Sequence, residues 1–273
     1  AYDRDTKVRL AIKTLKKRTG INILRFKNEF RALHDLEHPN LIKLGELFHE
    51  EDLFFFTMEL VEGTDLLKHV RLAPKRVPIL RGLSGMQLFH SAEFFPDLDD
   101  KTDPISSAGG DSNSTEKTQE FKRTIVRSST FDEEKLRKTL VQLARGLQTL
   151  HQTSMLHRDI KPSNVMVDND GRVVLLDFGL VTEESDYHSM VGKNAVGTAG
   201  FMSPEQAAAE PLTPATDWYA FGVIIYAALT GRLPFRGTPR EILFKKQSLL
   251  PKAPHRINPE VPDDLAKLVM ELL

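Results

Sequence analysis

The feature of this 273-residue chain that most constrains its fold is a regular repeat of leucines near its middle. These leucines recur every three or four positions, which places them on one face of a helix of about four turns. They are Leu136, Leu140, Leu143, Leu147 and Leu150. The preceding Thr130-Phe131-Asp132-Glu133 resembles a capping box, so we expect the helix to begin there. A helix with one apolar face needs a surface to pack against, which predicts a folded domain with a core.

The first 60 residues alternate between strand-like and helix-like patterns. The strand-like runs are residues 8–13, 41–48 and 53–60. They are apolar or partly alternating and are bounded by polar residues, as half-buried strands are. Between the first two runs, Phe26, Phe30 and Leu33 fall at helical spacing, with Glu29 beside that stripe. The predicted order is therefore strand, helix, strand, strand.

Beyond the leucine repeat, two short β-rich runs precede a mostly helical remainder. Residues 164–167 and 172–176 are separated by the turn Asp168-Asn169-Asp170-Gly171, which predicts a hairpin. The apolar stretches 218–229 and 265–273 then indicate helices. Together with the first 60 residues, these patterns predict an α+β protein with a small sheet-rich unit followed by a larger helical one.

Residues 71–129 show neither the period of a helix nor that of a strand, and we interpret them as an insertion. The stretch 101–130 is rich in serine and threonine and contains the breaker run Ser106-Ser107-Ala108-Gly109-Gly110, so we expect disorder there. The earlier part of the insertion carries several apolar residues, among them Phe94 and Phe95. It either packs loosely on the large unit or engages a partner.

Charge and cysteine content exclude several classes of function. With 37 Lys and Arg against 38 Asp and Glu, the net charge of −1 provides no field that would recruit nucleic acid or an anionic membrane. Residues 220–229 form the longest apolar run, about half of the ~20 residues that a membrane-spanning helix needs. The absence of cysteine excludes a disulfide framework and a thiolate metal site, and it fits the reducing cytoplasm.

Two loops flanking the predicted hairpin carry the residues most suited to chemistry. His157-Arg158-Asp159-Ile160-Lys161-Pro162-Ser163-Asn164 precedes its first strand, and Asp177-Phe178-Gly179 follows its second. Because hairpin ends lie close together, the two carboxylates and the carboxamide should meet. Such hard oxygen ligands suit Mg²⁺ when phosphate groups complete its coordination shell.

The order of these motifs resembles the eukaryotic-like, Hanks-type serine/threonine protein kinase family, in a bacterial form. The two loops are followed by Gly197-Thr198 and by Ser203-Pro204-Glu205 at workable spacing, and Ala11-Ile12-Lys13 precedes them. The resemblance covers nearly the whole chain outside the insertion. It implies a bilobal α+β fold with a small β-rich N-lobe and a larger helical C-lobe.

By this resemblance, residues 1–60 form the N-lobe and residues 61–70 form the hinge and the start of the C-lobe. Residues 71–129 are the insertion, and residues 130–273 form the C-lobe. No glycine precedes Lys13, so the N-lobe is expected to lack its first strands and the Gly-rich phosphate loop. The family's arginine partner of Glu205 would lie beyond Leu273, so we expect the C-lobe to be truncated too.

The resemblance assigns catalytic roles to four residues. Asp159 would accept the proton of the substrate hydroxyl, and Lys161 would neutralise charge that develops on the transferred group. Thr198 pairs with Lys161 in serine/threonine kinases, and Asn164 belongs to the same loop. The Mg²⁺ ligands implied are Asn164 and Asp177.

Four further residues would hold the nucleotide from the two lobes. Lys13 would bind the α- and β-phosphates, and Glu29 would pair with that lysine. Ala11 above and Met166 below would sandwich the adenine ring.

The connector between the lobes would bind the edge of the base. Met58 takes the position that controls access to the back of the pocket, and backbone groups of Glu59 and Val61 would contact adenine. Asp65 stands where an acidic residue faces the ribose.

The resulting hypothesis is a cytoplasmic serine/threonine protein kinase that uses ATP and Mg²⁺. Its partners would be protein substrates, with no nucleic acid and no membrane segment, and regulatory domains would follow the kinase in the full-length protein. Two alternatives remain open. One is a pseudokinase or scaffold that binds partners through its lobes and the 71–129 insertion, and the other is a small-molecule phosphotransferase on a related fold.

Overall fold

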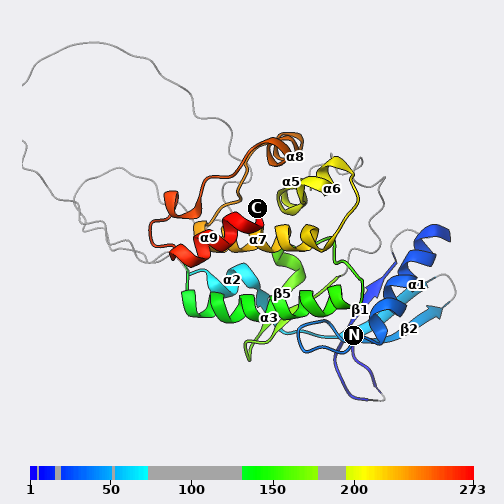
Figure 1. Cartoon of the computed structure of the whole chain (residues 1–273). Helices are drawn as coiled ribbons and strands as arrows, with labels where there is room; N and C mark the ends of the chain where they lie inside the picture. The colour runs from blue at the N-terminus through cyan, green and yellow to red at the C-terminus, as the bar shows by residue number, and fades with distance from the viewer. Residues whose placement is uncertain (5, 16–19, 51–52, 73–130, 178–194) are drawn as a thin grey trace, which may run out of the picture.

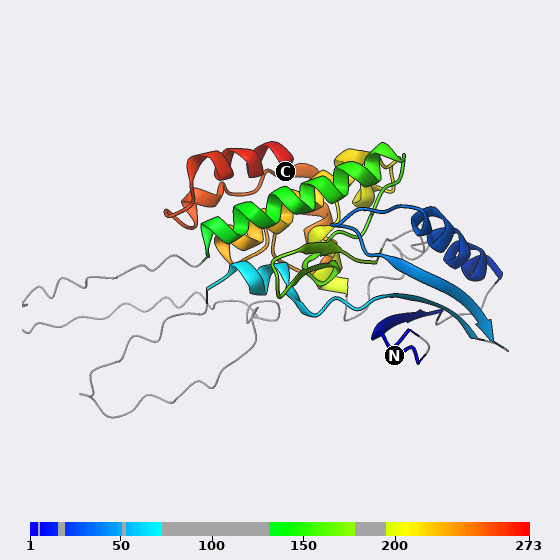
Figure 2. The ribbon, with the colours of Figure 1, turned by 90° about the horizontal axis from the view of Figure 1, so that it is seen from below.

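A computed structural model describes residues 1–4, 6–15, 20–50, 53–72, 131–177 and 195–273. In two views at right angles, a sheet-rich N-terminal part lies at one side of a larger helical part (Figures 1 and 2). This arrangement confirms the α+β fold class. Residues 73–129 of the predicted insertion lie outside the described residues, as do Phe178 and Gly179.

The N-terminal part is an antiparallel sheet with one helix packed on it. Its elements are β1 (Leu10–Thr14), α1 (Gly20–His34), β2 (Leu44–Glu50) and β3 (Leu53–Glu59), and the strand order is β1-β3-β2. The predicted order of strand, helix, strand and strand is confirmed. Phe26 and Phe30 of α1 pack on Phe56 of β3, with ring centroids 5.0 and 5.6 Å apart.

The predicted strand at 41–48 begins later than expected, at Leu44. Leu41 and Ile42 contact the helical part instead, because Leu41 forms an isolated bridge with Leu175 and the Ile42 N–H donates to the Leu175 carbonyl at 3.1 Å. Their apolar side chains are 3% and 4% exposed, so the segment serves as a buried link between the two parts.

The leucine repeat forms α3 (Glu133–Gln152), and all five leucines are buried. The predicted start at Thr130 is wrong by two residues. Asp132 is the N-cap, since its side chain accepts a hydrogen bond from the Lys135 N–H at 3.0 Å. A carboxylate at this position also interacts favourably with the positive end of the helix dipole.

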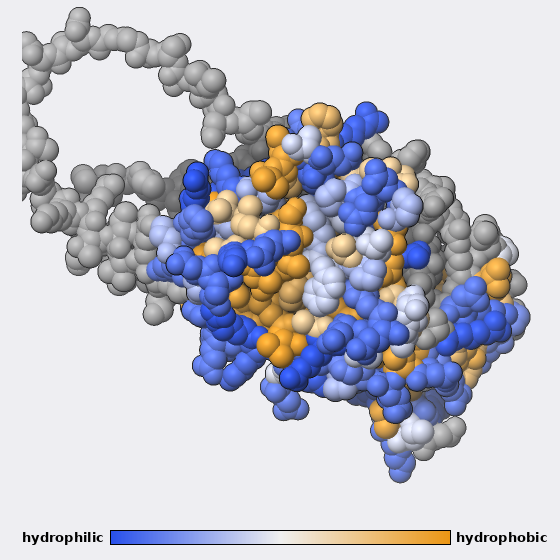
Figure 3. Space-filling model, in the orientation of Figure 1, coloured by the Kyte–Doolittle hydropathy of each residue, from blue (hydrophilic) through white to orange (hydrophobic). Residues whose placement is uncertain are grey.

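The centre of the helical part is α7 (Pro214–Thr230), whose residues from Thr216 to Leu229 are all buried except the half-buried Trp218. Around it lie α2 (Leu66–Val70), α3 and α9 (Asp263–Leu272). The helix ends at Gly231, whose φ of 74° provides the left-handed C-cap. The surface over α7 and α9 includes an apolar area (Figure 3). Among the described helices, none is long and apolar enough to cross a membrane.

Three further helices lie across α7 from α3 (Figure 1). They are α5 (Ala195–Phe201), α6 (Pro204–Ala208) and α8 (Pro239–Ser248). Two short 3-10 turns are Pro162–Asn164, which contacts α2, β4 and β5, and Pro254–Arg256, which contacts α7 and α9. Contacts join α8 to both α5 and α6.

A second small sheet carries both predicted chemical loops at its ends. It consists of β4 (Gly63–Asp65), β5 (Val165–Asp168) and β6 (Val173–Leu175), in the order β4-β5-β6. The β5–β6 hairpin is confirmed. The strand β4 was not predicted, because three residues that include a glycine are too short for a periodic signal. Asn164 directly precedes β5, and Asp177 follows β6 by two residues.

Asn40 joins the two parts of the molecule through buried hydrogen bonds. Its side-chain Nδ2 donates to the Val173 carbonyl at 2.8 Å and to Gln142 Oε1 at 3.0 Å. Its backbone carbonyl accepts from the Leu175 N–H at 2.9 Å. The side chain is 5% exposed, so these bonds are protected from water.

We expect Asn40→Ala to lower the free energy of unfolding by about 1–3 kcal/mol, because the Val173 carbonyl loses the buried Asn40 donor and Gln142 Oε1 keeps only the Val173 N–H. Urea unfolding followed by circular dichroism measures this change. The control is Asn169→Ala in the exposed β5–β6 turn, which should stay within about 0.5 kcal/mol of the wild type. An Asn40→Ala protein as stable as the control would contradict the role of this contact.

Candidate active site

Asp217, in the first turn of α7, holds the backbone of the loop that precedes β5. Its side chain is 1% exposed and accepts hydrogen bonds from the N–H groups of His157 and Arg158, both at 2.8 Å. A third contact, at 2.8 Å, joins Asp217 Oδ2 to His151 Nε2. A buried carboxylate with three partners provides a rigid anchor for this loop.

Arg158 adopts a left-handed backbone conformation, with a φ of 67°, that residues other than glycine rarely adopt. Both of its peptide groups are held: the N–H by Asp217 and the carbonyl by Gln206 Nε2 at 2.8 Å. The strained conformation is therefore fixed by the surrounding structure, as is common at functional sites. The backbone turn at Arg158 therefore directly precedes Asp159 in the chain.

His157 is completely buried and serves as a structural link between the two loops. Its Nε2 lies 2.9 Å from the Leu176 carbonyl, and its Nδ1 lies 3.3 Å from the Asp159 N–H. Burial lowers the pKa of His157, which favours the neutral ring. A neutral imidazole that carries its proton on Nε2 satisfies both contacts, so His157 is not positioned as a general base.

Asp159, Lys161 and Asn164 form one connected cluster. Lys161 Nζ lies 2.7 Å from Asp159 Oδ2, and Asn164 Nδ2 donates to the same oxygen at 3.0 Å and to the Asp159 carbonyl at 2.8 Å. Among the described residues, no hydrogen bond reaches Asp159 Oδ1. The Asp159 side chain is 28% exposed, so this second oxygen is open to a reacting group.

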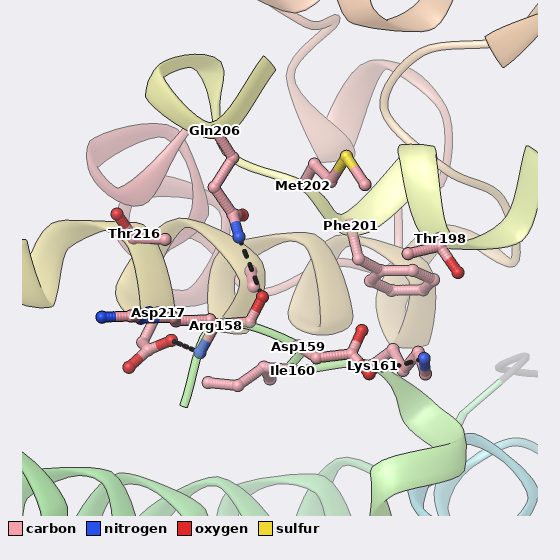
Figure 4. A pocket seen from close by; sticks show the side chains of 11 residues that line it. Arg158, Asp159, Ile160, Lys161, Thr198, Phe201, Met202, Gln206, Thr216 and Asp217 are labelled. Carbon is pink, nitrogen blue, oxygen red and sulfur yellow. Dashed lines mark hydrogen bonds and ion pairs between the residues drawn. The ribbon is translucent and has the colours of Figure 1, made fainter. Parts of the chain in front are cut away.

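A cavity of about 80 Å³ lies next to this cluster. Asp159 and Lys161 line one side, and Thr198, Phe201 and Met202 face them from the segment around α5 (Figure 4). The structure therefore brings Thr198 to the same cavity as Asp159 and Lys161, although about 40 residues separate them in the chain.

Gln206 connects this segment to the Asp159 loop and was not predicted. It forms a capping box with Ser203 at the start of α6, and its side chain also reaches the Arg158 carbonyl. The pattern Ser-x-x-Gln at residues 203–206 could have indicated the cap. The contact with Arg158 has no signal in the sequence.

Glu205 has a partner within the chain, although the sequence suggested that its partner lies beyond Leu273. The hydroxyl of Thr216 donates to Glu205 Oε1 at 2.6 Å. This bond attaches α6 to the start of α7, next to Asp217.

Lys13 of β1 reaches the loop after β6. Its Nζ lies 3.3 Å from Asp177 Oδ1 and 5.8 Å from the centroid of the Phe56 ring. Asp177 has a φ of 46°, and its side chain is 51% exposed. This ion pair joins the N-terminal sheet to the helical part of the molecule, which contains Asp159. Glu29 lies on α1, but its side chain is outside the described residues.

The residues expected around adenine are divided between the two sheets. Ala11 pairs with Met58 across β1 and β3, and Met166 pairs with Asp65 across β5 and β4. These four residues and Val61 are half-buried. Their roles in nucleotide binding stay predictions.

Two carboxylates expected near the nucleotide have additional partners that the sequence did not suggest. Glu59 accepts from the Lys43 N–H at 3.0 Å and pairs with Arg172 at 2.6 Å, which links β3 to the β5–β6 turn. Asp65 is the N-cap of α2 and accepts from the Lys68 N–H at 3.0 Å. Both carboxylates therefore stabilise the connector between the two parts of the molecule.

Two known protein families match this chain, over ranges that overlap. The protein kinase domain matches residues 114–273, and the phosphotransferase enzyme family matches residues 5–183. The chain is similar to serine/threonine-protein kinase PrkC of Bacillus subtilis, with 26% identity over 251 residues. This alignment covers 91% of the chain and 30% of the relative.

Two other relatives cover most of the chain. The probable serine/threonine-protein kinase CPE1738 of Clostridium perfringens is 25% identical over 272 residues, which are 97% of the chain and 31% of the relative. Ribosomal protein S6 kinase alpha-1 of Rattus norvegicus is 28% identical over 233 residues, 85% of the chain and 24% of the relative. The chain thus spans less than a third of the length of each of these three proteins.

Proposed function

This chain belongs to the protein kinase family, and we propose that it transfers the γ-phosphoryl group of ATP to serine and threonine hydroxyls of proteins. The observation that carries the proposal is the cluster of Asp159, Lys161 and Asn164 beside the cavity that Thr198 lines. Similarity to bacterial and animal serine/threonine kinases supports the same activity.

The side chains present fit a nucleotide bound with Mg²⁺, which would neutralise charge on the phosphates. Asn164 and Asp177 would hold the ion through hard oxygen atoms. In the described part of the chain, no three carboxylate, imidazole or thiolate side chains cluster as a complete metal site. Such a pair of ligands suits an ion whose remaining positions are filled by phosphate and water.

The chain's own residues account for positioning and charge. Asp159 Oδ1 would accept the hydrogen of the substrate hydroxyl, while Lys161 and Asn164 hold Oδ2 and fix the orientation of the carboxylate. Lys161 would also stabilise charge on the transferred group. Lys13 would bind the phosphates of ATP, with Glu29 proposed as its partner.

The base would lie between the two sheets. We propose that Ala11 and Met166 cover its faces and that the backbone of Glu59 and Val61 binds its edge, with Met58 behind it. The Asp65 carboxylate caps α2 and pairs with Lys68 Nζ at 3.0 Å, and it would accept a further hydrogen bond from a ribose hydroxyl.

The test compares phosphate transfer to three versions of one peptide, with serine, threonine or tyrosine as the acceptor. We expect transfer from Mg·ATP to the serine and threonine peptides, at least about tenfold less to tyrosine, and none after the metal is chelated. Nucleotide binding without any transfer would instead support the scaffold alternative.

The match to the phosphotransferase enzyme family favours a second candidate, transfer to a small molecule. The segment of Thr198, Phe201 and Met202 supports a protein acceptor, since it lines the cavity opposite Asp159 and Lys161. Transfer to small amino alcohols or sugars, but to no peptide, would overturn the protein kinase proposal.

For the whole protein, we propose a cytoplasmic kinase with regulatory domains that follow this chain. The boundaries proposed are an N-lobe at 1–60, a connector at 61–70, an insertion at 71–129 and a C-lobe at 130–273. The greater length of the relatives supports additional domains, and the absence of cysteine supports a reducing compartment.

A further inference from the structure

Lys246 is a buried lysine in α8 that the proposed chemistry does not use. It is 5% exposed, although lysine side chains are almost never fully buried without a partner. Within the described residues, it forms no ion pair. Its Nζ instead donates to the carbonyls of Ala199 at 2.8 Å, Gly200 at 3.4 Å and Met202.

The three carbonyls belong to the end of α5 and to the residue that follows it. The last carbonyls of a helix lack partners within the helix, and they carry the negative end of its dipole. An ammonium group has three N–H bonds and no acceptor, so it matches three carbonyl oxygens. Lys246 therefore caps the C-terminus of α5 from a different helix, α8, which lies beside it (Figure 1).

The capped segment is also the wall of the candidate active site. Thr198, Phe201 and Met202 line the cavity on the side opposite Asp159 and Lys161 (Figure 4). The hydrogen bonds from Lys246 therefore hold residues 199–202, the segment that faces the Asp159 carboxylate across the cavity.

We propose that Lys246 is a positioning residue for the acceptor substrate, which it serves by holding the 198–202 segment against the Asp159 loop. The inference rests on the proposed kinase function and extends it to a residue outside the site. It predicts an effect on binding of the peptide rather than on binding of ATP.

The surroundings of Lys246 make its charge sensitive to pH. The groups that face it are the Tyr219 ring of α7, whose centroid is 5.4 Å from Nζ, and the more distant Glu205 carboxylate of α6. On α8 itself, the charged neighbours Glu241 and Lys245 bond to Thr238 and to the Arg236 carbonyl. Burial lowers the pKa of Lys246 from 10.5 to about 7, and Glu205 opposes this shift.

The sign of the pH effect follows from the number of N–H bonds. Below about pH 7 the ammonium supplies three donors for the three carbonyls, whereas above it the neutral amine supplies two. The segment should therefore be held best at lower pH. Tyr219 does not compete for the proton, since burial raises the pKa of its phenol and keeps it neutral.

The experiment measures KM for a serine peptide and for ATP in Lys246→Met. The control is the neighbouring Lys245→Met, since Lys245 is half-buried, bonds to the Arg236 carbonyl and does not line the cavity. We expect peptide KM to rise about tenfold or more in Lys246→Met, because buried carbonyls lose their donors, with ATP KM unchanged. In the wild type, peptide KM should rise as pH increases through about 7. This rise should persist in Lys245→Met and disappear in Lys246→Met.

An unchanged peptide KM, or an equal change in both KM values, would overturn the proposal. The pH profile of the wild type tests it even if Lys246→Met does not fold, since a flat peptide KM across the range would also overturn it. A wild type that transfers no phosphate would refute the kinase function, and this proposal with it. Active wild type with a flat profile would refute the role of Lys246 alone.

Discussion

Replacing Asp159 with asparagine is expected to remove nearly all phosphate transfer while the protein stays folded. Asparagine has almost the same shape and can still accept hydrogen bonds from Lys161 and Asn164 at its carbonyl oxygen. It cannot accept the proton of the substrate hydroxyl, and general-base groups contribute about 10²–10⁴-fold to rates. We therefore expect kcat to fall by about that factor.

The measurement is steady-state transfer from Mg·ATP to a serine peptide, together with the urea midpoint and the affinity for ATP. The midpoint and the affinity should match the wild type, because Asp159 is half-exposed and is assigned no contact with ATP. The control is Asp170→Asn, an exposed aspartate in the β5–β6 turn, which should leave kcat unchanged. Normal turnover in Asp159→Asn would rule out the role assigned to this carboxylate.

Replacing Asp217 with asparagine is expected to reduce both stability and turnover. The carboxylate is 1% exposed and accepts from two backbone N–H groups and from His151. An asparagine would direct an NH₂ group at one of these donors and leave it unpaired, at a cost of about 1–3 kcal/mol. Because the same bonds hold Arg158 in its left-handed conformation, Asp159 would move, and a shift of about 1 Å can cost about 10²-fold in rate.

Urea unfolding and peptide kinetics on the same preparation measure both effects. The matched control is Asp263→Asn, which also changes an aspartate in the first turn of a helix, but at an exposed position in α9. It should change stability by less than about 0.5 kcal/mol and leave kcat intact. An Asp217→Asn protein that keeps both wild-type stability and wild-type turnover would show that the loop is held by other contacts.

Periodic elements were the most predictable part of the fold. The leucine stripe of α3 and the Phe26, Phe30 and Leu33 face of α1 were confirmed, since a buried helix face requires apolar residues at that spacing. Boundaries were less predictable. The α3 cap moved from Thr130 to Asp132, because several neighbouring residues can each cap a helix and local geometry selects one.

The candidate site was predictable where it depends on residues close together in the chain. Asp159, Lys161 and Asn164 lie within six positions, so their cluster follows from one loop. The pairing of Lys13 with Asp177 required the two parts of the molecule to meet, and it was not predicted, because the resemblance to a family implied Glu29 as the partner of Lys13. The partners of Glu59 and Asp65 were not foreseen, because an acidic residue has the same appearance in a sequence whether it faces a ligand or another side chain.

The sequence by itself determined the longer periodic elements and the order of the chemical loops, because local spacing decides which residues share a helix face or a turn. Tertiary structure alone decided the partners of Asn40, Gln206 and Lys246. Each is a polar residue that a sequence assigns to the surface, yet each is buried and bonded to backbone groups far along the chain. Such contacts depend on where whole elements pack, and a buried polar group is stable only once that packing supplies its partners.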